Sequence, residues 1–137
     1  MKINEILTEA SIFGRNKNKI YNTMINKIDC GPFDGGCVTV AMALQMVYGG
    51  DIVVLVGTPH GRTDKEAAQH AALLLNGKLV DGDGPLEPKA FIKRFVNAEM
   101  AHVGGTISSV RAIAPQDLPE APRDEELAKQ IASMMQK

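Results

Sequence analysis

The chain has 137 residues, of which 45% are hydrophobic and 23% are charged, so it can form one compact domain that buries about two-thirds of its unfolded surface. The formal net charge is -1 and the sequence pI is near 6.3, and neither gives a general attraction to nucleic acid or to an anionic membrane. The first residues are charged and amphipathic, and no apolar run approaches the ~20 residues of a membrane-spanning helix. We therefore expect a cytoplasmic protein with no nucleic-acid or membrane partner.

The first half of the chain predicts helices followed by a strand. Apolar residues recur at helical spacing over residues 3–10 and again over 20–28. The segment Cys37–Tyr48 is apolar on almost every side and stops at two glycines, which is the pattern of a helix buried all round. Residues 51–57 form a short β-branched run typical of a buried strand.

The middle of the chain predicts a β-hairpin. Residues 58–69 form a polar connection long enough to act as a flap, and an apolar run over 70–75 reads as a strand. Asn76 and Gly77 are the favoured pair for a type I′ turn, after which residues 78–83 return as a partner strand. In that register His70 faces Asp83 directly, whereas Asp81 pairs with Ala72 and lies diagonally from His70 on the same face.

The last third of the chain predicts a packing helix over residues 89–98, a strand over 103–113, and a proline-marked arm. The arm leads to a capped amphipathic helix over residues 124–135, which suits docking on the body or on a protein partner. The expected organisation is one α+β domain over residues 1–137, with a core at about 20–113 and the arm and terminal helix over 114–137.

Cys37 stands where a glycine-rich loop meets the predicted buried helix. A helix N-terminus carries unpaired N–H groups and a partial positive charge, and both favour a thiolate over a thiol. Gly35 and Gly36 leave the backbone bare, so a carbonyl substrate can approach the sulfur closely. Because a lone buried cysteine usually serves as a small hydrophobe, the surrounding pattern is what favours a nucleophile here.

His70 opens the predicted strand and is the candidate general base. Asp81 or Asp83 can hold one imidazole nitrogen while the other meets the thiol, which is the nucleophile, base and orienter arrangement of acyl-transfer enzymes. We expect Asp81, at the end of an apolar strand, to be better ordered than Asp83 between two glycines. His60 is an alternative base, but its place before Gly61 gives it mobility, so His70 is favoured.

These residues resemble the small versions of the papain-like cysteine hydrolase superfamily over about residues 29–83. The order Cys37, His70, Asp81 matches that group, which includes NlpC-type peptidases, double-glycine peptidases, transglutaminase-like proteins and papain-fold toxins that deamidate glutamine. The resemblance implies a central buried helix packed on a small antiparallel sheet, with extra terminal helices, and a thiol hydrolase that needs no metal and no organic cofactor.

One feature departs from the papain-like pattern. Such enzymes usually place an amide side chain a few residues before the cysteine as an oxyanion donor, and residues 29–36 contain neither Gln nor Asn. The remaining candidates are the backbone N–H groups of Gly36 and Cys37, with Asn22 or Asn26 as more distant possibilities.

The cysteine and histidine pattern gives no structural zinc site, because paired ligands usually stand two to four residues apart. Cys30 and Cys37 are expected to be reduced thiols, with Cys30 either a resolving thiol or a plain loop residue.

The expected function is that of a cysteine hydrolase acting on an amide-type bond of a peptide or protein substrate, as a peptidase, amidase or glutamine deamidase. The alternative is a non-catalytic papain-like binding or assembly protein whose partner docks on the C-terminal helix. The opening residues 2–9 also resemble those of small phage-encoded proteins.

Overall fold

The computed structural model describes residues 12–32, 35–60 and 65–135. The helix expected over residues 3–10 lies outside this part of the chain. In chain order the elements are η1 (Gly14–Asn16), α2 (Lys17–Ile28), α3 (Cys37–Tyr48), β1 (Asp51–Thr58), β2 (Ala67–Leu75), β3 (Lys78–Asp81), β4 (Gly84–Leu86), α4 (Pro88–Phe95), η2 (Val96–Met100), η3 (Ala101–Val103), β5 (Thr106–Ala112) and α5 (Glu125–Met135). Within the described residues, no helix has the length and apolar character needed to cross a bilayer.

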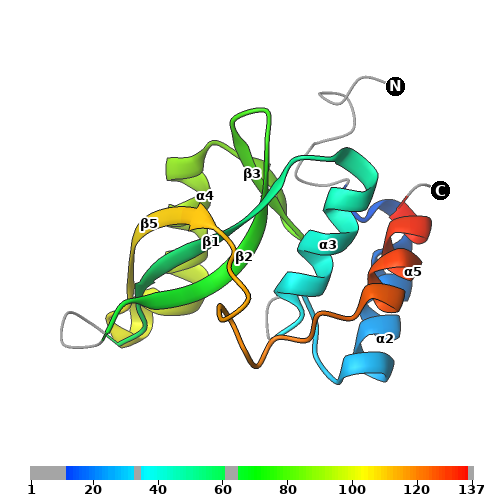
Figure 1. The fold of residues 1–137 in the computed structure, drawn as a ribbon, viewed down its shortest axis with the longest axis horizontal. Helices are drawn as coiled ribbons and strands as arrows, with labels where there is room; N and C mark the ends of the chain where they lie inside the picture. The colour runs from blue at the N-terminus through cyan, green and yellow to red at the C-terminus, as the bar shows by residue number, and fades with distance from the viewer. Residues whose placement is uncertain (1–11, 33–34, 61–64, 136–137) are drawn as a thin grey trace.

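The strands form one antiparallel sheet in the order β4-β3-β2-β1-β5 (Figure 1). The first four strands follow one another as a meander, and β5 returns to pair with the free side of β1. β1 is the most buried strand, with an unbroken buried run at its C-terminal end, because strands pair with it on both sides and helices cover both faces.

Helices pack on both faces of the sheet and confirm the α+β class. In Figure 1, α3 lies on one face together with α2 and α5, while α4 lies behind the sheet. Apolar side chains from α3, α2, α5 and the inner face of β2 form the main core cluster. A second cluster joins Phe91 and Phe95 of α4 to the opposite face of the sheet. The expected central buried helix is α3, and its bounds match the prediction.

The C-terminal helix belongs to the core. Leu127, Ala128 and Ile131 are fully buried in the main cluster. Asp124 caps α5, since its Oδ1 accepts a hydrogen bond from the N–H of Leu127 at 2.9 Å. Of the two docking alternatives for this helix, the structure has it on the body of the protein.

The hairpin turn forms as predicted, but the strands on either side of it differ. Asn76 and Gly77 both have positive φ, as a type I′ turn requires, and Leu73 pairs with Val80 in the expected register. β2, however, already begins at Ala67, so the last residues of the expected flap are strand. β3 ends at Asp81, so the predicted pairing of His70 with Asp83 is wrong.

The early end of β3 has a local cause. Gly82 and Asp83 form a tight turn into β4, and Asp81 pairs there with Gly84. β2 continues past this point with β1 as its strand partner, and His70 pairs with Leu55. One side of β2 therefore opens next to His70.

A β-bulge lies beside His70. Leu55 of β1 pairs with His70 and Val56 pairs with Ala68, which leaves Gln69 as the extra residue of β2. The Gln69 amide nitrogen donates to the carbonyls of Ala67 and Gly57, at 3.0 and 3.3 Å, and so fixes the bulge. A bulge bends a strand and redirects the neighbouring side chain, here that of the histidine.

The position of α5 gives a test of the fold. We expect Ile131→Ala to lower the free energy of unfolding by about 3 kcal/mol, because it leaves a cavity in a fully buried site. Urea denaturation monitored by circular dichroism measures the loss. Gln130→Ala, at an exposed position on the same helix, is the control and is expected to be close to neutral. Equal stability of the two variants would contradict the assignment of α5 to the core.

Candidate functional site

Cys37 is the first residue of α3 and is 8% exposed. The residue before it must be glycine, because a Cβ on Gly36 would lie 2.4 Å from a methyl carbon of Met24 and 2.6 Å from the carbonyl oxygen of Gly31. Gly35 has φ +132, a conformation that residues with side chains rarely adopt. Gly35 and Gly36 were expected to let a substrate approach the sulfur closely. They also allow the loop to close against α2.

The cysteine reaches the histidine where β3 has left β2. The thiol of Cys37 is hydrogen-bonded to His70, and the backbone N–H groups of Ala71 and Val38 also interact with the sulfur. The ladder between β2 and β3 covers only Leu73–Leu75 with Lys78–Val80, so the sulfur meets β2 beyond the last β3 pair. Cys37 of α3 therefore meets His70 at the margin of the sheet, where the ring of His70 packs on α4.

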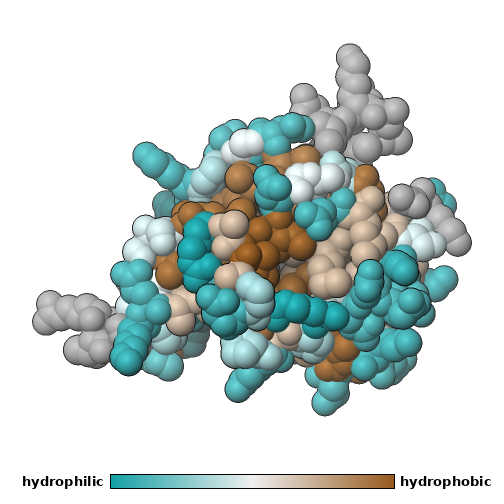
Figure 2. Space-filling view, in the orientation of Figure 1, coloured by the Kyte–Doolittle hydropathy of each residue, from teal (hydrophilic) through white to brown (hydrophobic). Residues whose placement is uncertain are grey.

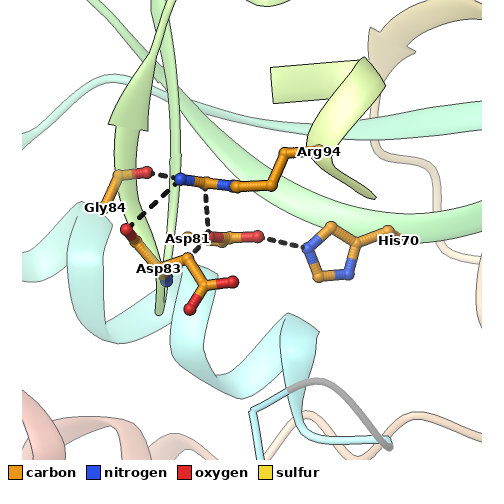
Figure 3. A network of polar contacts seen from close by, with 5 residues as sticks. All are labelled: His70, Asp81, Asp83, Gly84 and Arg94. Atoms are coloured by element: carbon orange, nitrogen blue, oxygen red, sulfur yellow. Dashed lines mark hydrogen bonds and ion pairs between the residues drawn. The ribbon is translucent and has the colours of Figure 1, made fainter. Parts of the chain in front are cut away.

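His70 is 2% exposed, and its Nε2 lies 2.8 Å from Oδ2 of Asp81 (Figure 3). An ionised carboxylate only accepts hydrogen bonds, so Nε2–H is the donor and Nδ1 is the nitrogen left for the thiol. The ring stacks on Phe95, with centroids 4.6 Å apart and planes at 15°. Phe91 lies 6.3 Å away on the same helix.

Both ends of the Cys37–His70 contact favour the charged forms. Burial alone raises the pKa of the Cys37 thiol, but the hydrogen bond and charge of His70, with the N–H groups of Ala71 and Val38, outweigh it and lower this pKa. Burial opposes the imidazolium as well, yet hydrogen bonds to Asp81 and Cys37 raise the pKa of His70 to about 9. The arrangement thus stabilises a thiolate–imidazolium pair.

The carboxylate on Nε2 of His70 is that of Asp81, which is 5% exposed. The backbone N–H of Asp83 donates to the other Asp81 oxygen, Oδ1, at 2.9 Å, while the Asp83 side chain is on an exposed residue of the turn. The structure therefore gives the two aspartates different places: Asp81 contacts the imidazole, and the Asp83 backbone supports Asp81.

Sequence analysis missed Arg94, which holds Asp81 from the α4 side. Arg94 of α4 donates to Asp81 Oδ1 at 3.3 Å and to the carbonyls of Gly84 and Asp83 at 3.1 and 3.3 Å (Figure 3). Residues 89–98 were expected only as a packing face. Arg94 stands beside Phe95 in that segment, so an arginine at the margin of the aromatic face was the one available signal.

A cleft of about 630 Å³ opens beside Cys37 and His70. One side is the start of β2 with Glu66, and the other is a segment that we call the strap, residues 114–123, which contributes Gln116 through Ala121. In the same orientation, Figure 2 shows apolar side chains exposed between the sheet and α3, bordered by hydrophilic ones. Ile52 and Ile113 line a separate groove of about 590 Å³.

The strap, which corresponds to the predicted proline-marked arm, is tied to the body of the protein. Arg111 of β5 makes a two-pronged hydrogen bond to the buried Asp117 carboxylate, and this holds the pKa of that carboxyl below its usual range. Arg123 donates to the Asp117 carbonyl at 2.7 Å. Thr39 of α3 donates to the carbonyl of Pro122 at 2.6 Å.

The strap also contains backbone strain next to Cys37. Leu118 has φ 51, which is uncommon for a bulky residue, and its side chain packs against the apolar cluster that includes Cys37. Ala121 joins the same cluster. The fold therefore holds a strained turn against the cysteine rather than leaving the cleft open on that side.

The oxyanion donors differ from expectation at one position. The N–H of Gly36 donates to the carbonyl of Gly31 at 2.9 Å, so this group is already used within the loop. Asn22 and Asn26 lie on exposed positions of α2 and do not line the cleft. Of the backbone candidates, the N–H of Cys37 at the start of α3 remains.

The other titratable candidates lie apart from the site. His60 follows β1, is exposed and does not line the cleft. Cys30 packs beneath Gly35, where an added Cβ would meet its Sγ at 3.0 Å. Across the described ranges, no group of three or more His, Cys, Asp or Glu residues is placed to hold a metal ion.

Comparisons of this chain with protein-family models, curated proteins and solved structures found no match.

The two aspartates can be separated experimentally. We expect Asp81→Asn to move the pH midpoint of Cys37 alkylation by iodoacetamide upward by about one unit, because His70 loses the carboxylate that raises its pKa. Asp83→Asn keeps the backbone N–H on Asp81 and is expected to leave the midpoint unchanged. Rates followed by peptide mass spectrometry across pH give the midpoints. A larger shift in Asp83→Asn would reverse the assignment.

Proposed function

We propose that this protein is a cysteine hydrolase of papain-like type that cleaves an amide-type bond through Cys37, His70 and Asp81. The observation that carries the proposal is the unbroken chain of contacts from thiol to imidazole to carboxylate, with the cysteine and histidine lining one cleft. Those three groups have the roles of nucleophile, general base and orienter in acyl transfer.

The proposed reaction begins with the thiolate of Cys37 attacking the substrate carbonyl carbon. The tetrahedral oxyanion collapses, the imidazolium of His70 gives its proton to the leaving amine, and the C–N bond breaks to leave a thioester. Neutral His70 then takes a proton from water, the hydroxide attacks the thioester, and the carbon–sulfur bond breaks. A carboxylic acid is released and the thiolate–imidazolium pair is restored.

Asp81 keeps the imidazole in place through this cycle. Its hydrogen bond to Nε2 leaves Nδ1 directed to the sulfur and the leaving group, and its charge stabilises the imidazolium. Phe95 restricts rotation of the ring by stacking on one face. Because the site is almost fully buried, these interactions are stronger than they would be in water.

For the oxyanion we propose the N–H of Cys37 together with the side-chain amide of Gln116. Gln116 lines the cleft from the strap, and in the described part of the chain its amide has no hydrogen-bond partner. The other cleft amide, Gln69, is already bonded to two carbonyls. The strap would thus supply the amide that is missing before Cys37.

The cleft volume of about 630 Å³ suits a peptide segment or an amide side chain of a protein, which is the substrate class we propose. The nucleophile requires a reduced thiol, and a reducing compartment such as the cytoplasm suits this chemistry. A phage origin is suggested only by the resemblance of residues 2–9 to the opening of small phage-encoded proteins.

The second candidate function is a non-catalytic protein that keeps this architecture and binds a partner. The engagement of the Gly36 N–H within its loop favours it, because the site then has fewer ready-made donors for an oxyanion. Such a protein requires no reactive thiol, so thiol reactivity separates the two candidates.

We expect Cys37 to be alkylated by iodoacetamide faster than Cys30 at neutral pH, because its pKa is lowered whereas an ordinary thiol is mostly protonated. His70→Ala is expected to slow Cys37 alkylation at least ten-fold at pH 7 and to raise its midpoint, since burial then acts on the thiolate unopposed. Cys37→Ser is expected to abolish turnover of p-nitrophenyl acetate with a thermal melt close to that of the wild type.

The pH dependence provides a further check on the same pair. Hydrolysis of an amide substrate is expected to fall as pH rises through about 9, because His70 then loses the proton that it gives to the leaving amine. Alkylation needs only the thiolate and is expected to stay high there. Superimposable alkylation curves for wild type and His70→Ala would reject the proposed pair.

The role of Gln116 can be tested with the same two probes. Gln116→Ala is expected to lower the acylation rate of Cys37 by p-nitrophenyl acetate about 10²-fold, in line with loss of one oxyanion donor. Displacement of iodide from iodoacetamide forms no oxyanion, so alkylation is expected to be unchanged. The control is Gln130→Ala, which removes an exposed amide that does not line the cleft. Equal losses with both probes would contradict an oxyanion role.

A further inference from the structure

The strongest feature that the proposed reaction does not yet use is the group of contacts on the α4 side of Asp81. Arg94 makes hydrogen bonds to one carboxylate oxygen and to two backbone carbonyls of the turn between β3 and β4. Its guanidinium also lies over the ring of Phe91, 5.1 Å from the centroid. The arginine is therefore fixed on several sides, and its side chain is only 22% exposed.

The two oxygens of Asp81 have separate partners. Oδ1 accepts from Arg94 at 3.3 Å and from the backbone N–H of Asp83 at 2.9 Å. Oδ2 accepts from Nε2 of His70 at 2.8 Å. In Figure 3 the carboxylate lies between the guanidinium and the imidazole, with one oxygen toward each. With Oδ1 held, the carboxylate cannot rotate away from the histidine.

Through two neighbouring residues, α4 contacts both the carboxylate of Asp81 and the imidazole of His70. Arg94 holds the carboxylate that orients His70, and Phe95 stacks on the imidazole itself. The helix is positioned by Phe91, which is 1% exposed in the cluster behind the sheet. Arg94 and Phe95, which both help to orient His70, therefore lie on the same helix.

We infer that Arg94 is a positioning residue of the proposed site: it acts through Asp81 to hold the imidazole of His70 in the orientation that keeps Cys37 a thiolate. This inference rests on the proposed function. Arg94 is not among the residues that line the cleft, and its hydrogen bonds reach the Asp81 carboxylate and the backbone of the turn after β3, so we expect its effect on the cysteine to pass through the carboxylate.

The charge-conserving Arg94→Lys variant separates positioning from plain electrostatics. As a nearby cation, Arg94 disfavours the imidazolium but favours the thiolate, so loss of its charge alone has opposing effects on the pH midpoint of Cys37 alkylation. Loss of a positioned carboxylate raises the midpoint, because His70 then loses its hydrogen-bond partner. Arg94→Met is therefore expected to raise the midpoint.

Other charged groups surround Arg94 and the Cys37–His70 pair, and the test leaves all of them unchanged. On the α4 side these are Asp83 and Glu99, which border a small cavity with Arg94. Tyr21 of α2 also faces these carboxylates, because burial and the charges of Asp83 and Asp81 raise the pKa of its hydroxyl. On the cleft side they are Glu66, Glu120, Arg111 and Asp117.

The experiment is a double-mutant cycle on the alkylation midpoint of Cys37, with iodoacetamide as the probe. Arg94→Met is expected to raise the midpoint by about one pH unit, which is about ten-fold in rate below the midpoint. In the Asp81→Asn background the same substitution is expected to give no further shift, since Arg94 acts through that carboxylate. Lys93→Met, an exposed neighbour on α4, is the matched control and is expected to leave the midpoint unchanged.

Arg94→Lys keeps the charge but cannot make the same set of hydrogen bonds, so it is expected to shift the midpoint in the same direction as Arg94→Met. Full rescue by lysine, a downward shift, or an additive shift in the Asp81→Asn background would each overturn the positioning role. A lowered melting temperature with an unchanged midpoint would also overturn it, as a purely structural contact. Arg94→Lys keeps the test decisive if Arg94→Met does not fold.

The outcome is separable from that of the proposed function. If the wild-type midpoint does not depend on His70, the Cys37–His70 pair itself fails. If it depends on His70 and Asp81 but not on Arg94, only the positioning role fails.

Discussion

The buried hydrogen bond between His70 and Asp81 is the constraint around which the rest of the site is built. Taking an imidazole and a carboxylate out of water is unfavourable unless every polar atom finds a partner. Here the ring nitrogens meet Asp81 and Cys37, and the second carboxylate oxygen meets Arg94 and a backbone N–H. In the described part of the chain, no buried side-chain nitrogen or oxygen lacks a hydrogen-bond partner.

This constraint explains why the sheet opens where it does. If β3 had continued alongside β2, a strand would occupy the place where the sulfur of Cys37 meets the backbone of Ala71. Instead the chain turns at Gly82 and Asp83, and the same turn presents backbone groups to Asp81 and Arg94. The bulge at Gln69 completes the geometry by breaking the regular alternation just before the histidine.

Local sequence signals predicted the parts of this structure that local chemistry decides. The apolar run of α3 ends at two glycines, and the pair Asn76-Gly77 dictates its turn, so both were predicted with the right bounds or register. The predicted hairpin gave two alternatives for the carboxylate on His70, the diagonal neighbour Asp81 and the directly opposed Asp83, and the structure has Asp81 there. The choice depended on where β3 stops, which pairing with β4 decides.

Contacts between distant segments could not be predicted in this way. Nothing near Arg94 in the sequence indicates that it will reach a carboxylate in β3, because that contact exists only once α4 has packed behind the sheet. Likewise, the prolines predicted only an arm at this place, whereas hydrogen bonds among Arg111, Asp117 and Arg123 hold it as one wall of the cleft. Proline restricts an arm but says nothing about what it docks against.

The strap and α5 together suggest how the stability of this fold relates to its chemistry. The strap keeps Leu118 in a strained conformation beside the cysteine, and strain of this kind persists only where surrounding contacts over-determine it. Those contacts are supplied by the two-pronged pair of Arg111 with Asp117 and by the burial of α5. Thr39 of α3 adds to them, because its hydroxyl donates to the carbonyl of Pro122 and accepts from the N–H of Asp124, where the strap meets α5. The C-terminal helix therefore contributes to the cleft without touching it: by anchoring one end of the strap, it fixes the wall that faces the thiol.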